Sequence, residues 1–216
     1  MELSKIGKFA SDHGHRITIH PSSFCVVASP NRDAMLNSIR ELNQIGLLFD
    51  VMGLEKTPFN KINIHMGGIY GDKEATAERF CKNLVELGNE SLRCRVTIEN
   101  DDGKNGFSVG ELHELVYKRI GIPIVMDILH HRLNTGNLTV EEALKLAVST
   151  WPEGVTPVIH YSESKREKED PSAPAIAHST YIDESIPVYG QDVDIMVEAK
   201  GTEQAVLRYL EKERNK

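Results

Sequence analysis

The sequence has little cysteine and no long hydrophobic run. Its three cysteines, Cys25, Cys81 and Cys94, are an odd number and show no CxxC spacing, so they indicate neither a disulfide framework nor a thiolate zinc site. No apolar stretch approaches the roughly 18 residues that a membrane helix needs. The first residues, MELSKIGKFASDHGHR, contain no signal-peptide core. These absences predict an intracellular protein without a membrane partner.

Positive charge is also in short supply. The chain carries 25 lysines and arginines against 32 aspartates and glutamates, a formal net charge of −7. This balance argues against a generic basic nucleic-acid binder, because the neutralisation of phosphates usually needs clustered Lys and Arg. Carboxylates around bound divalent cations, however, count as negative in the sequence although the loaded site is not negative. The acidic composition alone therefore does not exclude DNA as a partner.

Six short apolar segments recur about every 30 to 45 residues, and each ends in polar residues. The segments are RITIHP (16–21), INIHMGG (62–68), VTIENDD (96–102), IPIVMDILHH (122–131), TPVIHYSES (156–164) and DIMVEAK (194–200). Stretches with the helical spacing of apolar residues lie between them. Strands that alternate with helices predict an α/β protein with a parallel sheet, and near-continuous apolar strands predict that both faces of the sheet are covered.

Several helix boundaries are marked by local signals. Ser108 and Thr139 are candidate N-caps, the latter with Glu142 three residues on as a capping box. Gly121, followed by Ile122 and Pro123, is a helix stop signal.

The polar strand ends favour a TIM-type (β/α) barrel over an open sheet. Each predicted strand delivers His, Asp or Glu at its C-terminal end, and in a barrel these ends meet at one mouth. An open sheet of six strands would spread the same groups over about 25 Å at roughly 4.8 Å per strand. Since a complete barrel has eight strands and typically about 250 residues, we predict one catalytic domain over residues 1–216 that is incomplete at its N-terminus, with self-association as one way of covering the open edge.

The residues at these ends predict a metal centre. Imidazole and carboxylate groups without thiolates suit Mn²⁺, Zn²⁺, Fe²⁺ or Co²⁺. Eight such groups exceed what one ion can hold, so two or three ions would share them, and clusters of this kind bind a phosphodiester and activate water. The candidate ligands are His20, His65, Glu99, Asp127, His130, His160, His178 and Glu198.

Other polar residues are candidates for contacts around the centre. The string HMGGIYGDK (65–73) places glycine amides where a phosphate could approach, with Tyr70 and the point charge of Lys73 close by. Lys200 follows Glu198 and could contact the substrate or pair with a carboxylate. His131 cannot easily point the same way as His130, so it either supports a ligand or contacts the substrate. The long charged loop 160–182 is a candidate lid.

Three further histidines and three polar residues complete these assignments. His13, His15 and His113 have no placement at a strand end and are interpreted as surface residues. Asn100, Asp101 and Asp102 are candidates for orienting the ligands, although a solvated turn explains Asp102 equally well.

Several long strings resemble signature segments of the UV damage endonuclease family and occur in the same order from about residue 16 to 208. They are TIHPSSF, IHMGGIYGDKEATAERF, VTIENDD, VMDILHHRLN, VIHYSES, AIAHS and MVEAKGTEQAVLR. The resemblance implies a barrel that holds up to three divalent metals, commonly manganese, and that nicks double-stranded DNA on the 5′ side of UV photoproducts or abasic sites. By matching motifs, the family's metal ligands fall on the same eight positions, His178 included.

The chain also departs from the family pattern. The N-terminal βα units that supply another histidine ligand have no counterpart. Val158 stands where family members carry a lysine. Ser23 and Phe24 stand where they carry the glutamine and tyrosine that probe the damaged base pair, which makes both candidates for substrate binding.

We therefore predict a metal-dependent DNA repair endonuclease in which Glu99, Asp127, His160 and Glu198 carry the chemistry. A sugar isomerase or epimerase on the same barrel gathers similar residues and is one alternative. A catalytically impaired DNA-binding remnant is the other.

Overall fold

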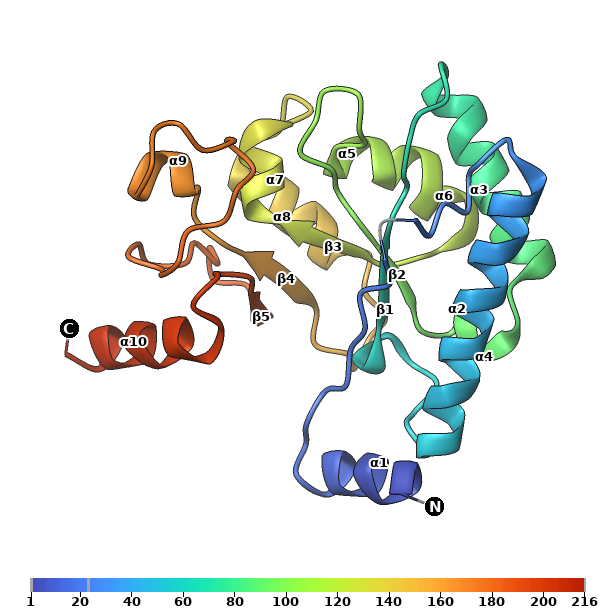
Figure 1. Cartoon of the computed structure of the whole chain (residues 1–216), viewed down its shortest axis with the longest axis horizontal. Helices are drawn as coiled ribbons and strands as arrows, with labels where there is room; N and C mark the ends of the chain where they lie inside the picture. Colours follow the sequence, from blue (N-terminus) through green and yellow to red (C-terminus); the bar gives the residue numbers. More distant parts are fainter. Residues whose placement is uncertain (1, 23, 216) are drawn as a thin grey trace.

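The computed structural model describes residues 2–22 and 24–215, and in this part of the chain the strands form one five-stranded parallel sheet in the order β1-β2-β3-β4-β5 (Figure 1). The strands are β1 (Ile62–His65), β2 (Val96–Glu99), β3 (Ile124–Asp127), β4 (Val158–Tyr161) and β5 (Asp194–Val197). The order is sequential throughout, whereas a doubly wound sheet reverses its order at a switch point. The predicted barrel topology is confirmed over these strands.

The first predicted strand is present in position but not as a regular strand. Ile19 forms an isolated parallel bridge with Ile62. The Ile19 amide donates to the Lys61 carbonyl over 3.1 Å, and the Asn63 amide donates to the Ile19 carbonyl over 2.9 Å. Pro21, which has no N–H group, follows closely and cannot continue such a ladder. The prediction of six strands is therefore corrected to five strands and one bridged segment beside β1.

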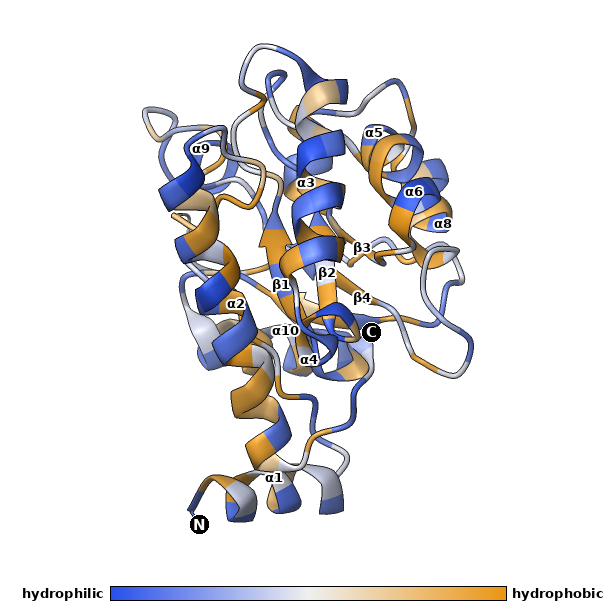
Figure 2. Cartoon of the chain, turned by 90° about the vertical axis from the view of Figure 1, so that its right-hand side faces the viewer, coloured by the Kyte–Doolittle hydropathy of each residue, from blue (hydrophilic) through white to orange (hydrophobic). Residues whose placement is uncertain are grey.

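Helices accompany the sheet, and several of them contact its strands. They are α1 (Glu2–Asp12), α2 (Arg32–Met52), α3 (Lys73–Leu87), α4 (Glu90–Arg93), α5 (Val109–Leu112), α6 (Lys118–Ile120), α7 (Ile128–Leu133), α8 (Val140–Val148), α9 (Lys165–Lys168) and α10 (Thr202–Arg214), with a 3₁₀ turn at Pro58–Asn60 and a π-helical turn at His113–Tyr117. Figure 2 shows mainly hydrophobic strands behind α3, whose outward side is largely hydrophilic. Within the described residues, no helix combines the length and the apolar character that crossing a membrane requires.

The predicted helix boundaries are confirmed. Ser108 and Thr139 each accept a hydrogen bond from the amide three residues on and form complete capping boxes with Glu111 and Glu142. Gly121 ends α6 with φ 71°, a left-handed conformation that glycine adopts without the steric cost of a Cβ atom.

Apolar side chains fill both sides of the sheet. The larger cluster lies between the strands and the outer helices and includes Ile64, Ile98 and Phe80. A smaller cluster of Val125, Val158 and Trp151, with partly buried Val155 and Met196 packed against it, forms a second core. Two of its members precede strand-end ligands by two residues and so share the inward face with them.

The sheet does not close at β5. This strand is only partly buried, whereas β2, β3 and β4 are buried along their whole length. Within residues 2–22 and 24–215, β5 pairs with β4 alone, and a groove of about 700 Å³ runs along it. The open edge agrees with the predicted incomplete barrel. Self-association over this edge stays a prediction.

Arg16 holds the curled sheet together at its N-terminal end. Its guanidinium donates to the Thr156 carbonyl over 2.7 Å, to Asp194 Oδ2 over 2.6 Å and to the Phe59 carbonyl over 3.0 Å. It also lies 4.5 Å from the centroid of the Phe59 ring. Arg16 begins the first segment, whereas Thr156 and Asp194 precede β4 and begin β5. One side chain therefore joins the two ends of the sheet.

We predict that Arg16→Met lowers the free energy of unfolding by about 2 kcal/mol, because partly buried carbonyls lose their donor. Urea denaturation measures this loss. Arg208→Met is the matched control, since its guanidinium also lies 4.5 Å from a ring centroid, that of Tyr181, and pairs with Asp183 over 3.0 Å. Its side chain is 53% exposed, so the control should lose less than about 1 kcal/mol. Equal losses would show that Arg16 does not join the ends of the sheet.

Candidate metal centre

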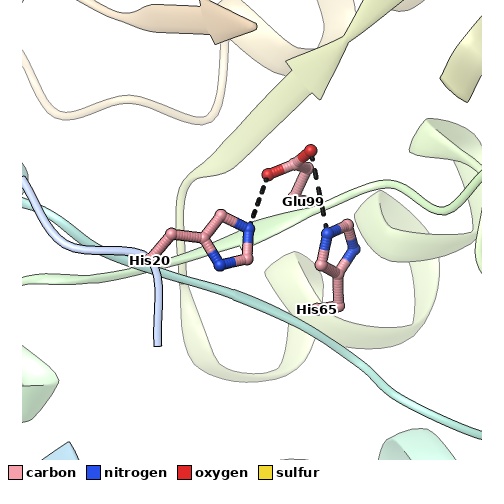
Figure 3. A group of neighbouring side chains, drawn as sticks. All are labelled: His20, His65 and Glu99. Carbon is pink, nitrogen blue, oxygen red and sulfur yellow. Dashed lines mark ion pairs between the residues drawn. The ribbon is translucent and has the colours of Figure 1, made fainter. Parts of the chain in front are cut away.

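The carboxylate of Glu99 lies at the centre of the mouth. Glu99 ends β2, and its side chain is 1% exposed. Figure 3 shows His20 and His65 pointing at its two oxygens from different segments, with His20 Nε2 3.4 Å from Oε2 and His65 Nε2 3.8 Å from Oε1. His160 Nδ1 lies 3.1 Å from Oε2, and His130 Nδ1 lies 3.4 Å from Oε1. Four imidazoles thus surround one buried carboxylate.

Six of the eight predicted ligands fall into two sets whose candidate ligand atoms lie within 4.8 Å of one another. One set is His20, His65 and Glu99, and the other is Glu99, Asp127, His160 and Glu198. Glu99 belongs to both sets. Because a carboxylate has two oxygens, one residue can serve a cation on each side.

Strand register explains why the ligands meet. His65 is the register partner of Glu99, and Asp127 is the register partner of His160. Glu198 follows β5, and its amide donates to the Tyr161 carbonyl over 2.9 Å. Neighbouring parallel strands end at the same edge of a sheet, so residues that end them lie side by side.

Hydrogen bonds fix which nitrogen each imidazole can offer to a cation. His65 Nδ1 lies 3.0 Å from Asp101 Oδ1, while Asp101 Oδ2 accepts from the Phe107 amide over 2.8 Å. His130 Nδ1 contacts the Asn100 carbonyl oxygen over 2.9 Å. In both rings Nδ1 is engaged and Nε2 is left available, which is the arrangement typical of metal-binding histidines. Asp101 was among the residues expected to orient ligands.

His130 and His178 lie outside the two ligand sets. The His130 ring is next to that of His65, with centroids 5.6 Å apart. His178 Nδ1 contacts the Glu198 carbonyl oxygen over 2.8 Å, and the residue lines the groove beside β5. Both are therefore close to the centre without sharing either set of ligand atoms.

The electrostatics of the centre suit a cation. Burial alone would raise the pKa of Glu99, but His160, His20 and His65 hold it well below its usual value. Burial raises the pKa of Asp127. Burial alone would lower the pKa of His160, but Glu99 and Glu198 beside it raise this pKa to about 9.

Two buried ligand atoms also lack hydrogen bonds. Among the described residues, Asp127 Oδ2 and His160 Nδ1 have no hydrogen-bond partner with suitable geometry, although His160 Nδ1 is close to Glu99. Buried polar atoms in native proteins are almost always satisfied. Unpaired ligand atoms of this kind, in a cluster of carboxylates and imidazoles, fit a bound divalent cation.

The sequence analysis missed Lys61, Asn63 and Thr97. The Lys61 ammonium lies 3.2 Å from His160 Nε2, and burial lowers its pKa to about 8. Asn63 Nδ2 donates to Glu99 Oε2 over 2.5 Å, and the Thr97 hydroxyl donates to Asn63 Oδ1 over 2.7 Å. The alternation of polar and apolar residues from Lys61 to His65 was the available signal, since it places the polar residues on one face of β1.

The candidate substrate contacts differ in exposure and in ion pairing, and they stay predictions. Phe24 is 86% exposed and Tyr70 is also exposed, with a φ of 47°. Ser23 lies outside the described residues. Lys73 is held by Glu111 over 2.7 and 2.9 Å, whereas Lys200 is exposed and has no ion pair among the described side chains.

Two expectations require correction. His131 is fully buried within α7, so it is inaccessible for the substrate contact that was considered. The loop after β4 is not a free lid, because the Ser179 amide donates to the Glu163 carbonyl over 2.8 Å and the Lys200 amide donates to the Ser179 carbonyl over 2.9 Å. These bonds attach the loop to the ends of both β4 and β5 and thereby position His178. Among the histidines assigned to the surface, His13 and His15 are exposed and His113 is partly buried.

Comparison with known proteins identifies the family of the chain. The profile of the family described as UV-endonuclease UvdE matches residues 1–215. The chain belongs to the UvdE family. It is 36% identical over 220 residues to the UV DNA damage endonuclease of Bacillus pumilus (strain SAFR-032), covering 97% of this chain and 65% of that protein. It is 30% identical to a putative UV-damage endonuclease of Acanthamoeba polyphaga mimivirus, covering 95% of this chain and 62% of that protein. The chain thus spans less than two thirds of the length of these relatives.

Solved structures give the same fold. The crystal structure of SacUVDE superposes with a TM-score of 0.83 at 33% identity, covering 99% of this UvdE-family chain and 71% of that chain. Endonuclease IV from Thermus thermophilus (TM-score 0.62, 18% identity, 97% of this chain and 79% of that chain) and a D-tagatose 3-epimerase-like protein (TM-score 0.67, 18% identity, 98% and 81%) share the fold alone. The barrel assignment therefore does not by itself separate nucleases from epimerases.

We predict that divalent cations raise the melting temperature of the chain by about 5–10 °C at a free concentration of ~100 times Kd. Binding at that concentration adds about 2.7 kcal/mol of stability, and 1 kcal/mol shifts the melting temperature of a protein of this size by about 2–4 °C. Differential scanning fluorimetry with and without Mn²⁺ measures the shift.

The variant Glu99→Gln should abolish this shift, because both ligand sets lose their shared carboxylate. Glu163→Gln is the control: Glu163 is also fully buried, but it accepts from the Asp183 and Glu184 amides, away from both ligand sets. A cation-induced shift that survives in Glu99→Gln would rule out the centre described here.

Proposed function

We propose that this protein is a divalent-cation-dependent endonuclease that cuts double-stranded DNA on the 5′ side of UV photoproducts and abasic sites. The observation that carries the proposal is the shared position of Glu99 between two ligand sets at the mouth of the sheet. Membership of the UvdE family supports the choice of DNA as substrate. A DNA substrate implies that the protein acts inside the cell.

Glu99 would lie between two cations. His20 and His65 complete one ligand set, and Asp127, His160 and Glu198 complete the other. When bound, the cations supply a nucleophilic water at neutral pH and stabilise charge on the phosphate and the leaving oxygen. The mixture of imidazoles and carboxylates without thiolate suits Mn²⁺, Zn²⁺, Fe²⁺ or Co²⁺, and the resemblance to the family favours Mn²⁺ among them.

A phosphodiester would approach through the cavity over the first ligand set. This cavity has a volume of about 260 Å³, and residues that line it include His20, His65, Asp101 and His130. Asp101 holds His65 in place there, so the histidine keeps Nε2 directed toward Glu99. The chain thereby presents oriented ligands at an opening that a backbone phosphate can reach.

Lesion recognition is assigned to Phe24. Its ring is exposed, and the residue follows His20 by four positions in the sequence, so it would supply an apolar wedge close to the centre. An apolar side chain inserts most easily where base pairs are already unstacked, and a damaged pair costs less to distort than an intact one. Selection by deformability would therefore favour lesions without direct reading of the sequence.

We predict that the wild-type chain with Mn²⁺ nicks a duplex that carries one cyclobutane dimer or one abasic site, and that Glu99→Gln and Glu198→Gln lower the rate at least ~100-fold because each removes a cation ligand. Gel analysis of end-labelled duplexes measures the rate and the position of the cut. Glu163→Gln should retain nicking. A folded, cation-loaded chain that leaves lesion duplexes intact would refute the endonuclease assignment, and interconversion of ketoses and aldoses by that chain would favour the epimerase alternative.

We predict that Lys200→Ala weakens binding to duplex DNA and lowers the slope of log K against log salt by about 1, because one phosphate contact is lost. Lys73→Ala should change the slope much less, since Glu111 already neutralises Lys73. Fluorescence anisotropy at several salt concentrations, with Ca²⁺ in place of Mn²⁺ to slow cutting, measures both slopes. Similar slopes for Lys200→Ala and the wild type would exclude Lys200 as a phosphate contact.

A further inference from the structure

We propose that Asn63, fixed by Thr97, is a positioning residue that holds the Glu99 carboxylate in the orientation needed to serve two cations. The inference rests on the proposed two-cation centre and adds a determinant of its cation affinity. Neither residue belongs to the ligand sets, and neither is accessible to substrate.

The two residues form a short hydrogen-bonded chain below the centre. Asn63 and Thr97 are register partners on β1 and β2, and both are 0% exposed. The Thr97 hydroxyl donates to Asn63 Oδ1 over 2.7 Å, and Asn63 Nδ2 donates to Glu99 Oε2 over 2.5 Å. These hydrogen bonds thus run from Thr97 on β2 to Asn63 on β1 and back to Glu99 on β2.

Glu99 and Thr97 bond to opposite ends of the Asn63 amide. An amide has a donor end and an acceptor end, and an ionised carboxylate only accepts. The NH₂ group therefore faces Glu99 in a charge-assisted bond, and the Thr97 hydroxyl donates to Oδ1 and so holds the other end of the amide in place. The opposite orientation would place the amide oxygen against a buried negative charge. Thr97 therefore acts on Glu99 only through Asn63.

The bond to Asn63 limits how Glu99 can rotate. Each carboxylate oxygen has two lone pairs, and Asn63 occupies one of them on Oε2. One lone pair is left on Oε2, which lies 3.4 Å from His20 and 3.1 Å from His160, and both lone pairs of Oε1 remain on the side of His65, 3.8 Å away. A carboxylate held in this way loses little conformational freedom when cations bind, so the affinity for them rises.

Comparison with the neighbouring strands indicates that this polar pair is not needed for packing. The residue two positions before each strand-end ligand lies on the same face as that ligand. On β3 and β4 these positions hold Val125 and Val158, which pack together in the smaller core. Among β1 to β4, only β1 and β2 hold a polar residue at this position, namely Asn63 and Thr97. Replacing both partners of a buried hydrogen bond by apolar groups of the same shape can be nearly neutral or stabilising, so stability alone does not require this pair, and its location directly below the shared carboxylate points to a role at the centre.

Isothermal titration with Mn²⁺ tests the proposal without a nuclease assay. Asn63→Leu should weaken binding about 10–100-fold, which is typical for the loss of a residue that orients a metal ligand. Thr97→Val should also weaken binding, and Thr97→Ser should keep nearly wild-type affinity because it keeps the hydroxyl. Thr97→Val also serves as the test if Asn63→Leu does not fold, which circular dichroism reports.

Asn60→Leu is the matched control. Asn60 is a buried asparagine close to β1, but its Oδ1 accepts from the Ile17 amide over 3.2 Å, away from Glu99. It should lose stability and keep its Mn²⁺ affinity within about twofold of wild type. The proposal is overturned if Asn63→Leu and Thr97→Val bind Mn²⁺ as tightly as wild type, or if Asn60→Leu loses as much affinity as they do. A chain that binds two ions in this pattern but cuts no DNA would refute the endonuclease and support the positioning role.

Discussion

The burial of the Glu99 charge is the constraint on which the rest of the site depends. Removing a carboxylate from water has an effective cost of several kcal/mol unless other groups compensate for it. Here four imidazoles and one amide surround the side chain, and they come from separate segments of the chain. These groups can meet only if the strands run parallel, end at one edge and curl toward one another. The parallel arrangement of the strands is therefore what allows the charge of Glu99 to be buried.

The curl persists although the sheet is open. Arg16 connects the start of the first segment with the starts of β4 and β5, so the N-terminal ends converge without continuous pairing. Inside the sheet, Val125, Val158 and Trp151 supply apolar packing on one side, and Asn63 and Thr97 supply hydrogen bonds on the other. The polar side lies below Glu99. The apolar side of the interior thus stabilises the fold, and the polar side would orient the Glu99 carboxylate.

The candidate ligands could be predicted from the sequence because most of them lie at or just after a strand end, which is a local feature. His65, Glu99 and Asp127 needed only the recognition of three parallel strands. Asn63 and Thr97 were missed because their role depends on which face of a strand they occupy and on the register between two strands, and neither is fixed by composition. The first segment was predicted as a strand because its apolar residues alternate, whereas Pro21 and the lack of a second partner leave it with one bridge. The resemblance to the family supplied DNA as substrate, which the fold alone could not, since epimerases share it.

The acidic composition is compatible with DNA binding for a reason specific to the proposed centre. Glu99, Asp127 and Glu198 place three carboxylates at the mouth, and carboxylate charge that bound cations do not offset repels phosphate. Two divalent cations carry more charge than these three carboxylates, so the loaded mouth becomes positive where the phosphate must lie. In the proposed endonuclease, attraction for DNA at this point would thus depend on the same cations that carry out the chemistry. Net charge computed from residues alone reports the unloaded state, so it argues against a generic basic nucleic-acid binder without excluding the proposed nuclease.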